Sequence, residues 1–354
     1  MKYEDLIPTD EASLVEKYKK IFVLGGWAEK PQIMGGGSSI VHTKDEMIDS
    51  PLEEIKKLAG DEFEVVYNQC YCDVVKENLG ATTLTARAAI ADCTDDDIIL
   101  CFISSVTAET EGLDRYSLHF ENYIDNIIRR FTSISKNIVV IMQTGSAYVP
   151  YVWDRKVDGI VQMWLAGESA GKAIADVLFG KVNPSGKLAE TFPNRLRTDF
   201  ENISASMKNV NYKEGFEVGY RYYDNHTDEI WYPFGHGLSY TSFEYNNLSA
   251  KLDGENINIS LDITNTGDVD GKEIVQIYFG RENSFYDRPV KELKGFEKVL
   301  VSAGKTEKVS VTIPVSDLAV YNVADSEWVV ENGEYKIYVG ASSQDIRLTA
   351  DIEL

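Results

Sequence analysis

The segment AETEGLDR at residues 108–115 places two glutamates, an aspartate and an arginine within eight positions. It follows an apolar run at 98–103, and ligand sites in open α/β sheets form beyond the carboxyl ends of the strands. A loop carboxyl group near apolar surroundings can have a raised pKa and act as a general acid. The same residues would also be found in a solvated acidic loop with a local Asp114–Arg115 ion pair. The residue types alone therefore do not decide between a catalytic site and a solvated loop.

A glycine-rich loop, GGGSS at residues 35–39, lies a short distance after the first apolar run. Glycines allow a backbone to approach a ligand closely. No Gly-Lys-Ser/Thr follows, as it would in a P-loop, and the loop does not start a long helix directly after a strand, as a dinucleotide-binding GxGxxG does. We interpret it as a tight active-site loop or a packing loop.

The overall composition excludes several classes of function. Lys and Arg total 35 and Asp and Glu total 57, and the resulting charge of −22 opposes binding to nucleic acid or to anionic membranes. The apolar runs are far shorter than the ~20 residues of a membrane span. The amino-terminal residues lack the pattern of a secretory signal, so we expect a cytoplasmic protein. The four histidines and four cysteines lack metal-ligand spacing, and no metal or organic cofactor is implied.

The first part of the chain, residues 1–245, alternates apolar runs with amphipathic helical patterns. Nearly continuous runs of this length are typical of parallel strands buried on both faces. We therefore predict an α/β sandwich with a mainly parallel sheet and helices on both faces. The runs are IFVLG (21–25), FEVVY (63–67), IILCFI (98–103), IVVIM (138–142) and GIVQM (159–163), and the helical patterns lie at 51–59, 118–135 and 168–179.

The pattern changes in the last part of the chain, residues 246–354. INISLDI (257–263) and VSVTI (309–313) alternate with period two, and turn residues separate short strand-like runs. This predicts an all-β sandwich of the fibronectin type III kind. The aromatic and proline-rich residues 190–245 are predicted to be an ordered connecting segment that packs across both domains.

Longer blocks of the sequence resemble the carboxy-terminal half of glycoside hydrolase family 3, the β-glucosidase and β-xylosidase family. The GGGSS loop and ETEGLDR also fit that family. Because the blocks span nearly the whole chain, the resemblance is specific. The long blocks are MWLAGESAGKAIADVLFGKVNPSGKLAETFP (163–193), GYRYYD (219–224) with WYPFGHGLSYTSF (231–243), and RPVKELKGFEKV (288–299).

The resemblance implies a retaining mechanism in which a barrel-domain Asp forms a glycosyl-enzyme and a sandwich-domain carboxylic acid protonates the leaving oxygen. It identifies Glu111 as the general acid/base, with Glu109 as the alternative. Asp114 and Arg115 would then fix the loop that carries the acid. The glycine loop, through Gly36, Gly37, Ser38 and Ser39, would line the mouth of the site.

The sequence departs from the family pattern because the barrel and its Asp-Trp nucleophile motif are absent from the chain. Three interpretations follow: part of a β-glycosidase whose barrel lies on another polypeptide or was cleaved off, a non-catalytic sugar-binding or assembly module, or an isolated fragment. Retention of ETEGLDR favours the first. The implied partners are a β-linked glycoside and a barrel-domain chain or a second copy of this chain, with no nucleic acid and no membrane.

An α/β sandwich without its barrel should expose the face that the barrel would cover. Trp27, Trp153 and Trp164 are candidates for such a patch, although core packing is the more frequent fate of Trp. We expect the last domain, residues 246–354, to have a packing role as a brace between domains. Its loop at 281–291, with Tyr286 and Arg288, could reach toward the site or a partner.

Overall fold

The computed structural model describes residues 18–70, 88–105, 117–150, 152–195 and 212–354. The chain divides into two compact units, Met1–Val182 and Asn183–Leu354, which are described separately below. The division falls earlier than residue 245, where we place the domain boundary from the sequence. No helix in the described ranges has both the length and the apolar character needed to cross a membrane.

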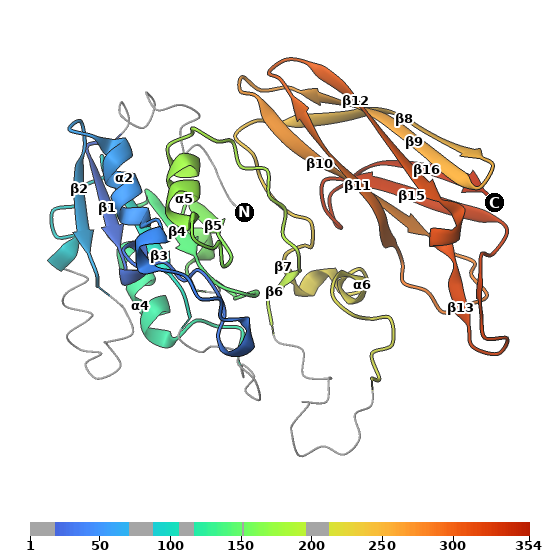
Figure 1. The fold of residues 1–354 in the computed structure, drawn as a ribbon, viewed down its shortest axis with the longest axis horizontal. Helices are drawn as coiled ribbons and strands as arrows, with labels where there is room; N and C mark the ends of the chain where they lie inside the picture. The colour runs from blue at the N-terminus through green and yellow to red at the C-terminus, as the bar shows by residue number, and fades with distance from the viewer. Residues whose placement is uncertain (1–17, 71–87, 106–116, 151, 196–211) are drawn as a thin grey trace. The chain divides into compact units, whose positions relative to one another are not determined.

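The first unit contains a five-stranded parallel sheet in the order β2-β1-β3-β4-β5, as predicted (Figure 1). Every residue of β3 and β4 is buried, which requires cover on both faces of the sheet. The strands are β1 (Lys20–Leu24), β2 (Glu64–Asn68), β3 (Ile98–Ile103), β4 (Ile138–Met142) and β5 (Gly159–Gln162).

The helices of the first unit are α2 (Pro51–Ala59), α4 (Asn122–Phe131) and α5 (Ala170–Leu178), with 3-10 turns η1 (Gly26–Ala28), η2 (Gly37–Ser39), η3 (Asp45–Met47) and η5 (Asp154–Lys156). Helices α2 and α5 lie side by side (Figure 1). Gly171 at the start of α5 permits a close approach, because a Cβ there would lie 2.5 Å from the carbonyl oxygen of Asp49.

The second unit is built around an antiparallel sandwich, as predicted. One sheet has the order β11-β10-β15-β16 and the other β12-β9-β8. Strand β9 alternates exposed or half-buried residues with buried ones, and its buried residues join the core shared by both sheets. The strands are β8 (Phe243–Asp253), β9 (Asn256–Asn265), β10 (Gly271–Gly280), β11 (Glu292–Val301), β12 (Thr306–Pro314), β15 (Glu334–Gly340) and β16 (Ile346–Glu353).

Smaller elements surround this sandwich. They are β6 (Phe192–Pro193), α6 (Tyr220–Tyr223), η6 (Thr227–Glu229), β7 (Ile230–Tyr232), η7 (Val315–Leu318) and the hairpin β13 (Val320–Asn322) with β14 (Glu327–Val329). The described part of the predicted connecting segment is ordered, and it belongs to this compact unit.

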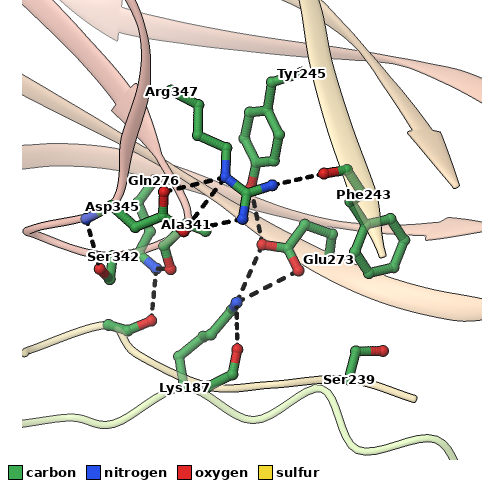
Figure 2. A network of polar contacts seen from close by, with 12 residues as sticks. Lys187, Ser239, Phe243, Tyr245, Glu273, Gln276, Ala341, Ser342, Asp345 and Arg347 are labelled. Carbon is green, nitrogen blue, oxygen red and sulfur yellow. Dashed lines mark hydrogen bonds and ion pairs between the residues drawn. The ribbon is translucent and has the colours of Figure 1, made fainter. Parts of the chain in front are cut away.

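A buried ion pair joins Lys187, just before the connecting segment, to Glu273 in strand β10 of the sandwich (Figure 2). The ammonium of Lys187 lies 3.1 and 3.4 Å from the two carboxylate oxygens of Glu273 and donates to the Gly237 carbonyl at 3.0 Å. The Tyr245 hydroxyl donates to Glu273 at 2.8 Å. Burial, followed by the Glu273 carboxylate, raises the pKa of this phenol, so it remains a donor.

A second set of contacts joins the sequence blocks GYRYYD and RPVKELKGFEKV. Lys291 forms an ion pair with Asp224, and Arg221 lies 3.3 Å from Glu292. The Leu293 amide donates to the Tyr220 hydroxyl at 2.8 Å. Two blocks about 70 residues apart in the chain therefore form one contact region of the second unit.

Candidate active-site pocket

A pocket of about 260 Å³ lies in the first unit where strands β3 and β4 end. Ser104 and Ser105 follow β3 directly, and Gln143 to Ser146 follow β4. The segment after β1 contributes the opposite wall through Gln32, Met34 and the glycine loop. The carboxyl ends of neighbouring parallel strands meet at one edge of the sheet, which explains why these separate segments converge.

Gln143 holds the base of this pocket together. Its side chain is fully buried, its Nε2 donates to the Trp27 carbonyl at 3.0 Å, and its Oε1 accepts from the Gln32 amide at 2.6 Å. The Ser104 hydroxyl donates to the Gln143 carbonyl at 2.7 Å. One amide side chain therefore fastens the segment after β1 to the end of β4, and it leaves no buried polar group of its own unsatisfied.

The glycine loop enters the pocket through part of its length. Gly36 and Ser39 line it, as does Gly35, whereas Gly37 and Ser38 are exposed and do not line it. Gly37 has a φ of 63°, a conformation that favours glycine. The Ser39 hydroxyl donates to the Gly36 carbonyl at 2.8 Å, which closes the turn.

The candidate acid residues Glu111 and Glu109, together with Asp114 and Arg115, lie outside the described residues. The described residues on either side of their segment are at the pocket or next to it. Ser105 lines the pocket. The Leu118 carbonyl accepts a hydrogen bond of 2.7 Å from the amide of Val149, whose neighbour Tyr148 lines the pocket.

The described lining is electrically neutral. Tyr148 is its only ionisable side chain, and the other polar groups are hydroxyls, amides and backbone atoms. These groups suit hydrogen bonding to a polyhydroxylated ligand, but no described lining group is a carboxyl that could exchange a proton near neutral pH. Across the described ranges, no three His, Cys, Asp or Glu residues gather in a way that could hold a metal ion.

Two of the three predicted surface tryptophans belong to the core instead. Trp153 is fully buried and donates through Nε1 to Asp125 at 2.8 Å, and Trp27 is also buried. These two candidates therefore do not form an exposed patch, and the alternative of core packing is confirmed for both. Trp164 is half-buried.

Comparison with known proteins assigns the chain to a family. Residues 14–240 match the glycosyl hydrolase family 3 C-terminal domain. The chain belongs to this family. Residues 273–343 match a fibronectin type III-like domain, in agreement with the sandwich of the second unit.

Several named glycosidases are similar to this chain. The thermostable β-glucosidase B of Acetivibrio thermocellus is 39% identical over 98% of the chain and 46% of its own length. An exo-α-(1→6)-L-arabinopyranosidase of Bifidobacterium breve is 35% identical over 95% of the chain and 44% of its own length. The chain thus spans about half the length of these curated family 3 relatives.

Solved structures of family 3 enzymes show the same fold. The β-glucosidase of Bifidobacterium adolescentis has a TM-score of 0.85 with 32% identity, over all of this chain and 51% of its own. β-Glucosidase 3B of Thermotoga neapolitana has a TM-score of 0.84 with 31% identity, over all of this chain and 52% of its own.

Proposed function

We propose that this chain is one part of a retaining β-glycosidase and that it supplies the general acid/base, Glu111, to a site completed by a barrel domain. The observation that carries the proposal is the pocket at the ends of β3 and β4. Ser105, the last described residue before the segment that contains Glu111, lines that pocket. Family membership, and a length about half that of the relatives, support a barrel partner.

The neutral lining is suited to this role. A general acid must keep its proton until the leaving oxygen needs it, and a cation beside it would lower its pKa. The described lining contains no Lys, Arg or His. Apolar and neutral surroundings would therefore favour the protonated form of a carboxyl group brought to this pocket.

The reaction would run in two steps. The nucleophile carboxylate of the barrel attacks the anomeric carbon while Glu111 transfers its proton to the leaving oxygen, so the glycosidic bond breaks and a glycosyl ester forms. The Glu111 carboxylate then takes a proton from water, which attacks the anomeric carbon and releases the nucleophile. Both steps require the two carboxyl groups to lie only ~5 Å apart.

The substrate would be a β-linked glycoside, in keeping with the β-glucosidases among the relatives. The relatives also include an arabinopyranosidase at similar identity. The substrate is therefore proposed only as a β-linked glycoside, without naming the sugar.

The first test is the mass of the native protein purified from its source, with the subunit masses after denaturation. We expect the native protein to contain a barrel domain, either on the same polypeptide or on a second one, and activity on aryl β-glycosides that requires it. A native species that contains only this chain and is inactive would overturn the proposal and leave a binding module or a fragment.

The second test replaces the acid in the active assembly. Glu111→Gln should lower kcat/KM on phenyl glycosides by about 10²–10⁴-fold, because a poor leaving group needs the proton. Dinitrophenyl glycosides should lose much less in the glycosylation step, and azide should partly restore turnover. Glu109→Gln is the matched control. An active Glu111→Gln beside an inactive Glu109→Gln would move the assignment to Glu109.

A further inference from the structure

A groove of about 490 Å³ lies in the second unit, apart from the pocket described above. Its walls come from residues around α6, from the loop that follows β10, and from η7 with the hairpin β13–β14. Three aromatic side chains and six charged ones line it. None of these residues has a place in the proposed glycosidase mechanism.

The aromatic side chains are unusually exposed. Trp328 is 71% exposed, Tyr321 44% and Phe216 47%. Tyr321 and Trp328 face each other in the register of β13 and β14, which places them on the same side of the hairpin, with their ring centroids 5.4 Å apart. The two rings meet at 65°, edge to face, so the exposed tryptophan is held by its tyrosine neighbour and offers an apolar ring face with a polar edge, a surface suited to the C–H face of a pyranose ring.

The charged side chains around these rings cancel one another. Arg221, Arg288 and Lys294 oppose Asp287, Glu292 and Asp317. A lining with no net charge disfavours a polyanion or a polycation and suits a neutral ligand. Asp287 and Asp317 are exposed and form no hydrogen bond or ion pair with another described residue, so their carboxylates are available to accept hydrogen bonds from hydroxyl groups.

Glu331 fixes one wall of the groove before any ligand binds. Its carboxylate accepts from the Ser284 hydroxyl at 2.7 Å, from the Phe285 amide at 2.8 Å and from Arg288 Nε at 3.0 Å. Arg288 also donates to the Leu318 carbonyl at 2.9 Å, which ties the loop to η7. A wall held in place in this way costs little ordering entropy when a ligand binds.

We propose that this groove binds a neutral oligosaccharide, with a sugar ring stacked on Trp328 and hydroxyl groups bonded to Asp287 and Asp317. The site would be non-catalytic and would hold oligosaccharide chains on the surface of the second unit. The inference depends on the second unit alone and does not rest on the proposed glycosidase activity.

Isothermal titration of the chain with cellotetraose, laminaritetraose and xylotetraose tests the proposal. At least one of these probes should bind, and Trp328→Ala should weaken that binding by about tenfold or more, since a stacked aromatic anchor carries much of the energy of such a site. Trp328→Phe keeps a ring and should retain most of the affinity, which separates loss of stacking from loss of folding.

The matched control is Phe285→Ala. Phe285 is 90% exposed but does not line the groove, so its removal should leave binding unchanged. Absence of binding to all three probes, or equal binding by Trp328→Ala and the wild type, would overturn the proposal. If Trp328→Ala instead lowers only the mass of the native assembly, the groove is a protein interface and the proposal is wrong.

Discussion

The pocket of the first unit and the groove of the second differ in the kind of polar group that each presents. The polar side chains of the pocket are hydroxyls and amides, and its base is held by Gln143, whose hydrogen bonds are satisfied within the protein. The groove displays six charged side chains beside exposed aromatic rings. Under the two proposals, the neutral pocket would leave the proton chemistry to a carboxyl group brought from elsewhere, whereas the charges at the groove would serve binding and hold its walls.

The same contrast continues in the buried interactions of the two units. The second unit relies on the ion pair Lys187–Glu273, with side chains 10% and 6% exposed (Figure 2). The first unit holds its site with neutral hydrogen bonds. Removing one member of a buried ion pair leaves an uncompensated charge, which costs far more than losing a neutral hydrogen bond. The comparison therefore predicts unequal responses to substitution.

Lys187→Met should have the largest effect on stability. It leaves the Glu273 carboxylate buried without its cation, so the second unit should lose about 3–5 kcal/mol of its free energy of unfolding. Hydrogen exchange of peptides from β9 and β10, followed as urea is increased, measures the loss of unfolding free energy in this unit. The control is Lys172→Ala, which removes an exposed pair with Asp176 in the first unit and should cost less than about 0.5 kcal/mol.

A double variant decides whether the charge itself is responsible. Lys187→Met combined with Glu273→Gln removes both charges and keeps an amide oxygen that can accept from the Tyr245 hydroxyl, so it should recover much of the stability lost in the single variant. A double variant as unstable as Lys187→Met would show that the contacts of the lysine chain matter more than its charge, and the contrast between the two units would fail.

Gln143→Leu should have a smaller effect, confined to the first unit. It leaves the Gln32 amide and the Trp27 carbonyl without their partner, at a cost of about 1–3 kcal/mol for each buried group that stays unsatisfied. Hydrogen exchange on peptides that contain residues 32–39 should become faster, while peptides from β9 and β10 should not change. An unaltered glycine loop in this variant would show that Gln143 does not position it.

The sequence predicted those features that depend on local pattern. The apolar runs at 98–103 and 138–142 are strands β3 and β4, with the predicted bounds. The helical pattern at 118–135 is longer than helix α4, which begins at Asn122, because tertiary contacts hold the residues before it. The Leu118 carbonyl bonds to the Val149 amide, and Phe120 stacks on Tyr148.

The sequence predicted the site only in part. The pocket contains Gly36 and Ser39 of the predicted loop, but Gln143 was missed. Its partners are 111 and 116 residues away in the chain, and no local spacing shows that relationship. A polar residue directly after a buried strand is the signal that could have indicated it. The groove was missed for a similar reason. Tyr321 and Trp328 lie opposite each other only because of the register of the β13–β14 hairpin, which the sequence pattern does not show.

The smallest predicted effect is the pH dependence that Glu331 contributes to stability. Burial raises the pKa of this carboxyl, but hydrogen bonds from Ser284 and the Phe285 amide, with the charges of Arg288 and Arg281, outweigh burial and hold the pKa below its usual value. A carboxyl with a lower pKa in the folded state adds stability above its unfolded pKa, about 4.3. That stability declines as the pH falls from there through the folded pKa.

Glu331→Gln should therefore destabilise the second unit at pH 7, and its difference from the wild type should narrow as the pH falls below about 4.3. Urea midpoints measured between pH 7 and pH 3 test this. Glu307→Gln, at an exposed position of β12, is the control and should follow the wild-type pH profile. An equally steep acid profile in Glu331→Gln would mean that the groove wall does not depend on an ionised carboxylate, and the electrostatic contrast between the two units would then rest on buried pairs such as Lys187–Glu273 and Lys291–Asp224.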